Sequence, residues 1–293
     1  MRILRSRADL AALDELRGER PLVLVPTMGA LHEGHLSLVR RGATAGPVVV
    51  SIFVNPTQFG PGEDYAAYPR DLDRDLALLG PLAPAAIFVP EVATLYPQPG
   101  GVTVQPGRRA EGLCGAGRPG HFGGVLTVVA KLFGLVRPDV AVFGRKDAQQ
   151  CLVIAEMVRD LMLPVRLVDA PTMREPDGLA MSSRNRYLEG DARRRAGCLA
   201  RALDRAHRLV AGGERDTAAV VAAMMRILGE ADRVEYAAVR RLDDWSEPAR
   251  LAGPTLLAVA ARVGPARLID NLVLDITGAG VAERPLLGGG DEA

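Results

Sequence analysis

A short apolar run that leads through a turn into a helical pattern is the feature that most constrains the fold of this chain. Residues Pro21–Val25 are apolar throughout, which is typical of a strand buried on both faces of a parallel sheet. Pro26 and Gly29 interrupt the run. From Leu31 to Val39 apolar residues and His35 recur at helical spacing, so the sequence predicts a strand, a tight turn and a helix.

The turn places two of the chain's four histidines, His32 and His35, in the first turn of the predicted helix. Unpaired backbone N–H groups and the positive end of the helix dipole lie there too, which suits an anion such as a phosphate. Gly34 between them leaves the helix backbone open to close approach. A zinc-protease motif would need histidine where Leu36 stands, so that class is excluded; a metal pair or two ordinary surface histidines stay open.

Composition excludes several other classes. The formal net charge is +1 and the pI about 7.8, so no net positive field favours nucleic acid or an anionic membrane. No apolar run approaches the ~18 residues needed to span a bilayer, and the N-terminus lacks the apolar core of a signal peptide. We therefore expect a cytoplasmic protein. The three cysteines are widely spaced and fit neither a disulfide framework nor a zinc cluster.

Apolar runs alternate with helical patterns through the first ~170 residues, as in βαβ units. The predicted strands are Leu22–Val25, Val48–Val54, Ala86–Val89, Val140–Phe143 and Val165–Val168, with a weaker one at Val102–Gln105. Predicted helices cover Asp71–Leu79 and Ala148–Leu161, and a glycine-rich loop covers Glu111–Gly124. A parallel sheet of this kind collects its binding residues at the carboxyl ends of the strands.

The pattern changes after about residue 172. Helices are predicted at Asp191–Val210 and Asp216–Gly229, followed by strands at Val234–Arg240, Leu256–Val263 and Arg267–Leu274. We expect an α/β protein: a Rossmann-like parallel-sheet domain over residues 1–172 and a smaller α+β cap domain over 173–277. Residues 278–293 hold five glycines and little apolar periodicity, which predicts a disordered tail.

Five segments fall where the strand ends would meet: Pro26–His35, Phe53–Phe59, Arg118–Phe122, Phe143–Gln150 and Met181–Asn185. Together, in order and at comparable spacing over about residues 1 to 275, they resemble the pantothenate synthetase family, a group of nucleotidyltransferase-type proteins with a His-x-Gly-His motif. Singly the motifs are weak, and the set is specific.

The resemblance implies a C–N bond-forming ligase of pantothenate and coenzyme A biosynthesis. It would condense (R)-pantoate with β-alanine at the expense of ATP, through a pantoyl adenylate, giving pantothenate, AMP and diphosphate. It implies a Rossmann domain that binds ATP and pantoate, a homodimer, and Mg²⁺ carried in on the ATP phosphates rather than held by protein ligands. No nucleic acid or membrane partner is implied.

By the same resemblance, His35 would stabilise charge on, or donate a proton to, the leaving diphosphate, with His32 beside it. Lys146 would meet the phosphates as a point charge and Arg184 would close over them. The implied ATP-binding residues are Met28, Gly29, Ala30, Leu31, His32, Glu33, Gly34, His35, Gly144, Arg145, Lys146, Asp147, Met173, Met181, Ser182, Ser183 and Arg184.

Gln58 and Gln150 match pantoate-binding positions, with Gln58 also next to the β-alanine site and Asn55 nearby. A neutral amide orients a substrate carboxylate without blunting its nucleophilicity as a tightly paired cation would. Ordinary structural roles stay open for several of these residues: Asn55-Pro56 as a turn, Asp147 as a helix N-cap, and Ser182-Ser183 as a polar loop. His121 fits a catalytic loop or a structural one equally well.

Met173 departs from the family, which more often has a valine near the adenine, and a flexible thioether fills similar space. A cytidylyltransferase, which leaves the nucleotide on its product, shares the strand, His-x-Gly-His and helix arrangement. The glutamine pair and the Met-Ser-Ser-Arg segment argue against it. A non-catalytic nucleotide-binding module would leave both histidines, Lys146 and the amides unexplained together.

Overall fold

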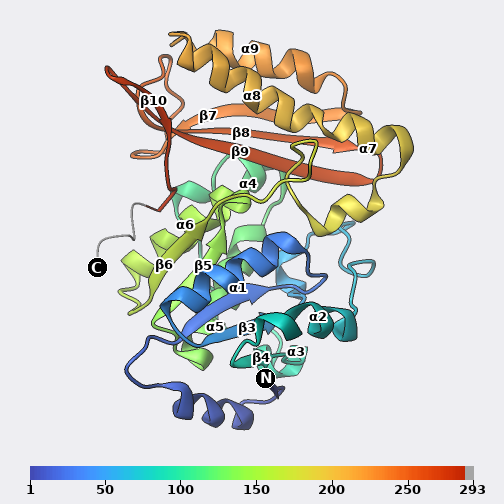
Figure 1. Ribbon diagram of the computed structural model, residues 1–293, viewed down its shortest axis with the longest axis vertical. Coiled ribbons are helices and arrows are strands. Elements are labelled where there is room, and N and C mark those ends of the chain that lie inside the picture. Colours follow the sequence, from blue (N-terminus) through green and yellow to red (C-terminus); the bar gives the residue numbers. More distant parts are fainter. Residues whose placement is uncertain (288–293) are drawn as a thin grey trace. The chain divides into compact units, whose positions relative to one another are not determined.

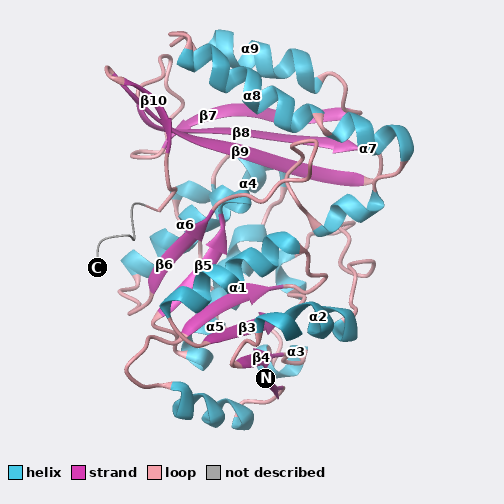
Figure 2. Ribbon diagram, viewed as in Figure 1, coloured by secondary structure: helices cyan, strands magenta, loops and turns pink. Residues whose placement is uncertain are grey.

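The computed structural model describes residues 1–287 and divides the chain into two compact units. Unit 1 comprises Met1–Arg145 and Gln149–Ala170, and unit 2 comprises Lys146–Ala148 and the described residues from Pro171 onward. Figure 1 traces the chain through both units, and Figure 2 shows the helices, strands and loops of each. Each unit has its own sheet and is described by itself.

Unit 1 is built on a six-stranded sheet whose paired strands are all parallel. In spatial order its strands are β1 (Arg2–Leu4), β4 (Ala86–Phe88), β3 (Val48–Ile52), β2 (Val23–Thr27), β5 (Val140–Gly144) and β6 (Arg166–Ala170). The chain order reverses between β2 and β5, and such a reversal opens the crevice in which parallel sheets bind ligands. The predicted fold class is confirmed.

The helices of unit 1 follow the strands along the chain. The α-helices are α1 (Glu33–Ala45), α2 (Leu72–Leu79), α3 (Val92–Leu95), α4 (Leu113–Gly117), α5 (His121–Val136) and α6 (Ala148–Asp160). The 3-10 segments are η1 (Ala8–Leu16), η2 (Pro56–Gln58), η3 (Gly80–Leu82), η4 (Arg108–Ala110) and η5 (Arg145–Asp147). Helix α1 packs on β2, β3 and β5. Gly42 allows the close approach, because a Cβ there would lie 3.0 Å from a methyl of Val23 and 3.3 Å from one of Val48.

The residues predicted as strand β2 are fully buried. Leu22, Val23, Leu24 and Val25 are each 0% exposed, as expected of a strand covered on both faces. The apolar run is therefore a core strand, and the turn that follows it starts from a fixed point. The helix begins later than its spacing predicts, at Glu33, because His32 serves as the N-cap.

Unit 2 has an antiparallel sheet in the order β10 (Gly280–Glu283), β9 (Ala266–Thr277), β8 (Gly253–Val263) and β7 (Arg233–Arg241). Helices α7 (Gly190–Ala196), α8 (Cys198–Ala211) and α9 (Thr217–Leu228) and the 3-10 turn η6 (Ser183–Tyr187) complete it. Helices α8 and α9 lie side by side and pack on the strands (Figure 1). This unit has its own apolar core, shared between the helices and the sheet.

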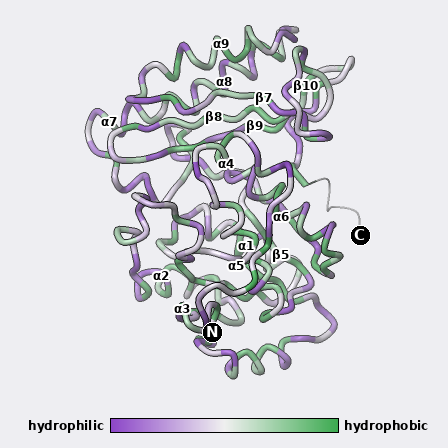
Figure 3. The backbone as a smooth tube through the Cα atoms, turned by 180° about the vertical axis from the view of Figure 1, so that it is seen from behind, coloured by the Kyte–Doolittle hydropathy of each residue, from purple (hydrophilic) through white to green (hydrophobic). Residues whose placement is uncertain are grey.

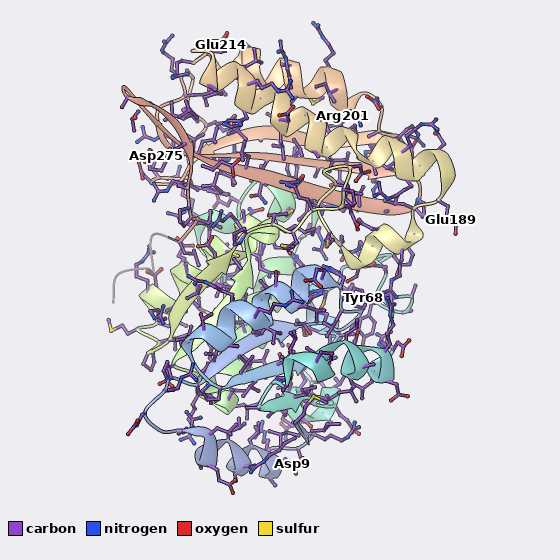
Figure 4. All side chains as sticks on the ribbon, viewed as in Figure 1. Asp9, Tyr68, Glu189, Arg201, Glu214 and Asp275 are labelled. Carbon is purple, nitrogen blue, oxygen red and sulfur yellow. The ribbon has the colours of Figure 1, made fainter. Side chains whose placement is uncertain are left out.

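Helix α8 owes its position to one apolar face. Cys198, Leu199, Ala202, Leu203 and Ala206 are all 3% exposed or less and recur at helical spacing. Hydrophobic and hydrophilic residues accordingly alternate along the helix in Figure 3. On the other face lies Arg201, which pairs with Glu230 at 2.6 Å (Figure 4); the pair is about half exposed and adds little stability.

Four expectations from the sequence are wrong. The helix predicted at Asp191–Val210 is broken at Gly197, where a residue of low helix propensity joins α7 to α8. The strand predicted at Val102–Gln105 is irregular, and Val102 is 91% exposed. The glycine-rich loop Glu111–Gly124 instead contains α4 and the start of α5, since its apolar side chains are buried and burial outweighs propensity.

The fourth concerns the C-terminal tail. Residues Gly280–Glu283 form β10, which pairs with β9 from Thr277 to Leu274, so the expectation of disorder fails there. Within this strand the side chain of Val281 packs against the core of unit 2. The rest of that expectation, from residue 288 to 293, lies outside the described residues.

Candidate active site

The turn between β2 and α1 is held in a left-handed backbone conformation. Gly29 has φ +77° and Ala30 has φ +52°, which is strained for a residue with a side chain. The carboxylate of Asp75 on α2 accepts hydrogen bonds from the backbone N–H groups of Ala30 at 2.9 Å and Leu31 at 2.7 Å. Desolvation raises the pKa of this carboxyl, and the two N–H donors act against that rise.

The two histidine rings of the turn lie against each other at the N-terminus of α1, with their planes tilted by 43°. Their ring centroids are 4.1 Å apart. Nδ1 of His32 accepts from the N–H of Gly34 at 3.1 Å, and Nδ1 of His35 accepts from the N–H of His32 at 3.4 Å. Since each Nδ1 is an acceptor, each neutral ring carries its proton on Nε2. The pair thus presents Nε2–H donors where the helix dipole already favours an anion.

The carboxylate of Glu33, beside the two histidines, would repel an anion if it had no cationic partner. It pairs with Arg40 along the helix. Glu33 also occupies the first turn of α1, where a negative charge stabilises the helix. The negative charge that Glu33 places beside the histidines is therefore shared with an arginine.

Asn55 and Gln58, the predicted amides of unit 1, form a buried network with the turn. The two residues are 1% and 8% exposed. Nδ2 of Asn55 donates to Oε1 of Gln58 at 3.0 Å, and Nε2 of Gln58 contacts Sδ of Met28 at 3.1 Å. The structure therefore brings these three predicted site residues together.

Asn55 is also a structural residue. Its Oδ1 accepts from Tyr96 Oη at 2.8 Å and from Thr57 Oγ1 at 2.9 Å, and its Nδ2 donates to the carbonyl of Gly124 at 3.1 Å. Asn55 caps η2 through the N–H of Thr57. The turn role and the proposed binding role both fit this geometry, because one amide orients the other.

A charged network holds the main chain of Gln58. Its carbonyl accepts from Nδ1 of His121 at 2.8 Å and from Nη2 of Arg118 at 3.2 Å. Arg118 makes a two-pronged ion pair with Glu63, at 2.7 and 2.6 Å, and its Nη1 lies 2.8 Å from Nε2 of His121. Burial opposes ionisation of Glu63, yet the Arg118 guanidinium outweighs it and lowers the pKa of that carboxyl.

This network favours a structural role for His121, which sequence reasoning left undecided. The residue is 8% exposed and is the first residue of α5. Its two ring nitrogens contact Gln58 and Arg118, so it links the charged pair to the main chain that carries the predicted pantoate-binding amide. An aromatic cluster adjoins the network, with the ring of Phe59 6.0 Å from that of Tyr68 (labelled in Figure 4).

Helix α5 approaches the backbone of η2 at Gly124. A Cβ at this position would lie 2.2 Å from the carbonyl oxygen of Thr57 and 2.7 Å from the backbone nitrogen of Gln58. Only glycine allows two backbones to come so close. The glycine content that suggested a flexible loop therefore serves tight packing next to the predicted binding residues.

The segment after β5 contributes Gly144 and Arg145 to unit 1. Nε of Arg145 donates to Asp169 on β6 at 2.6 Å, and the side chain of Asp169 is 3% exposed. The Arg145–Asp169 pair therefore fixes the backbone that follows β5, the strand next to β2. Gln150 lies on α6 and is half-buried, while its neighbour Gln149 is 6% exposed and hydrogen-bonds to backbone groups of Cys114 and Arg109.

Unit 2 contains the remaining predicted residues. Nζ of Lys146 lies 3.6 Å from the carboxylate of Asp147. The N–H of Met181 donates to the carbonyl of Met173 at 2.9 Å, which closes a hairpin-like turn. Ser182 caps η6 by accepting from the N–H of Arg184 at 3.3 Å, and Ser183 is the first residue of η6. The interpretation of Ser182 as part of a polar loop is therefore correct in part, since its hydroxyl organises the turn.

Sequence reasoning missed Asp75, Glu63 and Tyr96. For Asp75 a signal was present: it lies on the apolar stripe of α2 with Leu72, Leu76 and Leu79, where a carboxylate needs buried donors. The described residues 1–287 contain no group of three His, Cys, Asp or Glu side chains placed to hold a metal ion. No helix within the same range is long and apolar enough to cross a membrane.

Known proteins match this chain over most of its length. A family model described as pantoate-beta-alanine ligase matches residues 2–273. The pantothenate synthetase of Moorella thermoacetica is 52% identical over 256 residues, 86% of this chain and 90% of the relative. Pantothenate synthetase 1 of Bradyrhizobium diazoefficiens is 50% identical over 280 residues, 94% and 98% of the two chains.

Two solved structures are also similar. The pantothenate synthetase from Thermus thermophilus has a TM-score of 0.88 and 45% identity, covering 93% of this chain and 99% of its own. The pantoate-beta-alanine ligase from Francisella tularensis, solved in complex with beta-gamma ATP and beta-alanine, has a TM-score of 0.78 and 32% identity, covering 93% and 97%.

Replacing Gly124 with Ala tests the close contact between α5 and η2. The added methyl would overlap the backbone of Thr57, and overpacking of this kind costs about 1–3 kcal/mol. We expect G124A to lower the free energy of unfolding in urea by that amount. Gly134, on the same helix with nothing within 4 Å of a built Cβ, is the matched control: G134A should be neutral or stabilising by up to about 1 kcal/mol. Equal stability of the two variants would contradict the packing role.

Replacing Glu63 with Gln tests the charged network. A carboxyl whose pKa is lowered by folding stabilises the protein above its ordinary pKa of 4.5, and this stabilisation is lost as the pH falls through the native value. We expect E63Q to be less stable than the parent protein at pH 7, with the difference shrinking below pH 4.5 in urea unfolding. The control E15Q removes an exposed ion pair with Arg2 and should change stability little at either pH. A difference for E63Q that is constant with pH would reject the network's contribution.

Proposed function

The chain belongs to the pantoate-beta-alanine ligase family, and from this premise we propose that it joins (R)-pantoate to β-alanine with ATP as the energy source. The observation that carries the proposal is a contact within unit 1. His32 and His35 lie ring against ring at the N-terminus of α1, and the amide of Gln58 contacts Met28 in the same turn. The imidazoles, which are suited to binding phosphates, and the Gln58 amide, which is suited to orienting an acid, thus lie at the same turn.

The first half-reaction forms the adenylate. A carboxylate oxygen of pantoate attacks the α-phosphorus of ATP, the bond from that phosphorus to the bridging oxygen breaks, and diphosphate leaves with the electron pair. Charge grows on the bridging and non-bridging oxygens in this step. Nε2–H groups of the two imidazoles, the N-terminus of α1 and the ammonium group of Lys146 stabilise that charge.

The second half-reaction forms the amide. The β-alanine amine attacks the acyl carbon, the bond from that carbon to the AMP oxygen breaks, and the nitrogen loses a proton. Asn55, Gln58 and Gln150 hold the acid by uncharged hydrogen bonds, which orient it at little cost to its reactivity. Arg184 and the serines beside it are assigned to the phosphates, and Met173 and Met181 to the nucleotide.

In this scheme magnesium enters the site bound to the phosphates of ATP. The acidic groups of the β2–α1 turn already have partners, since Asp75 accepts from backbone N–H groups and Glu33 pairs with Arg40. The phosphates themselves are then the ion's ligands, and Mg²⁺ neutralises part of their charge. We further propose that residues 1–172 bind ATP and pantoate, that 173–277 act as a cap, and that the enzyme works as a cytoplasmic homodimer.

The reaction is tested with the purified protein, ATP, Mg²⁺, pantoate and β-alanine. We expect AMP, diphosphate and pantothenate in equal amounts, and no AMP when pantoate is withheld. A cytidylyltransferase would instead leave a nucleotidyl group on a stable product. Detection of such a product, or of nucleotide binding without turnover, would reject the proposed ligase.

Substitution of His35 or Lys146 tests the binding of the phosphates. H35A and K146A should each lower the rate of pantoyl adenylate formation by about 10²-fold or more, as removal of one charge-stabilising donor does. The rate is measured by pantoate-dependent exchange of diphosphate into ATP, and folding by thermal unfolding. H207A, on the half-buried face of α8 in unit 2, is the control and should keep the parent rate. Near-normal rates in both test variants would contradict the assigned roles.

A further inference from the structure

Asp75 carries a buried carboxylate whose two oxygens both accept from backbone groups. Asp75 is 2% exposed. The donors are the N–H groups of Ala30 and Leu31, which lie 45 and 44 positions earlier in the chain. A carboxylate of such burial is costly unless strong hydrogen bonds compensate it. The sequence thus keeps an acid inside the apolar face of α2, where it bonds to the turn that precedes the histidines.

The turn needs this support because its backbone is strained. Ala30 has a side chain and a φ of +52°, and a residue in this region costs of order 1 kcal/mol or more, which persists only where the surroundings over-determine it. Oδ2 of Asp75 also lies 2.9 Å from where a Cβ of Gly29 would be. The carboxylate therefore holds Ala30 and Leu31 by hydrogen bonds and leaves room only for glycine at position 29.

The carboxylate also decides which N–H groups a phosphate can use. The donors of Ala30 and Leu31 are consumed by Asp75, and a second anion would be repelled from them. The N–H groups of Gly34, His35 and Leu36 bond to His32, so the proposed phosphate site rests on the imidazole rings rather than on the backbone of Ala30 and Leu31. Leu31 directly precedes His32, so the orientation of this backbone sets the position of both rings.

We propose that Asp75 is a positioning residue for adenylate formation: by holding the Ala30–Leu31 backbone it aims His32 and His35 at the triphosphate. The role rests on the proposed function and involves no contact with substrate. An amide could not replace the acid, since it offers one acceptor oxygen and would turn an NH₂ group against a backbone N–H.

The experiment compares D75N with two variants of the same helix in the full-length enzyme. D73N removes an equal charge from an exposed position, and D71A removes the N-cap that accepts from Arg74, which costs about 1 kcal/mol of stability. Diphosphate exchange gives kcat and the KM values, thermal unfolding gives stability, and NMR follows the amide protons of Ala30 and Leu31.

We expect D75N to lower kcat for adenylate formation by about 10- to 100-fold, the effect of a displacement near 1 Å, and to shift both amide signals upfield. D71A should lose stability but keep kcat within about twofold, and D73N should change neither. Should D75N unfold at the assay temperature, D75E, which keeps the charge and adds one methylene, carries the same expectation.

A D75N or D75E variant with parent kcat, or amide signals that do not move, would overturn the proposal. Equal losses of kcat in D75N and D71A would do so too, since they would indicate helix stability alone. Failure of the proposed function is seen separately, because the parent enzyme would then show no pantoate-dependent exchange, and the amide signals would still report whether Asp75 holds the turn.

Discussion

Backbone N–H groups exposed where parallel strands turn into helices are the constraint on which this structure depends. Each such group that is shielded from water needs an acceptor. In unit 1 a side chain supplies the acceptor at two such places, Asp75 at the turn after β2 and Asn55 at η2 after β3. In unit 2, whose sheet is antiparallel, Ser182 does the same for η6. Residues that satisfy the backbone thereby also fix the predicted binding groups.

The division of labour within unit 1 follows from charge. Two imidazole rings and the positive end of the helix dipole lie at the start of α1, whereas the amides of Asn55 and Gln58 are neutral and share a hydrogen bond. Arg118 forms an ion pair with Glu63 and also donates a hydrogen bond to the main-chain carbonyl of Gln58. The charges of Arg118 and Glu63 thus offset one another, and the side-chain amides of Asn55 and Gln58, proposed to receive the acid, are uncharged.

Much of this could be predicted from the sequence where local signals agree. The apolar run before Pro26 predicted strand β2, and the family resemblance to pantothenate synthetases is confirmed by the matches to known proteins. The predictions that failed depended on contacts between residues far apart in the sequence. Glycines between Glu111 and Gly124 indicated a loop, yet Gly124 lies against Thr57, far away in the chain, and Asp75 finds its partners 44 and 45 positions away.

The contact at Gly124 has a mechanical consequence. Because α5 and η2 touch through their backbones at Gly124, neither segment has room to move toward the other there. Helix α5 carries a run of buried side chains from Phe122 to Val136, so a shift of this helix would disturb the interior of the domain. The amides proposed to receive the acid are accordingly anchored to a helix that is packed into the core, and we expect motion during turnover in other segments.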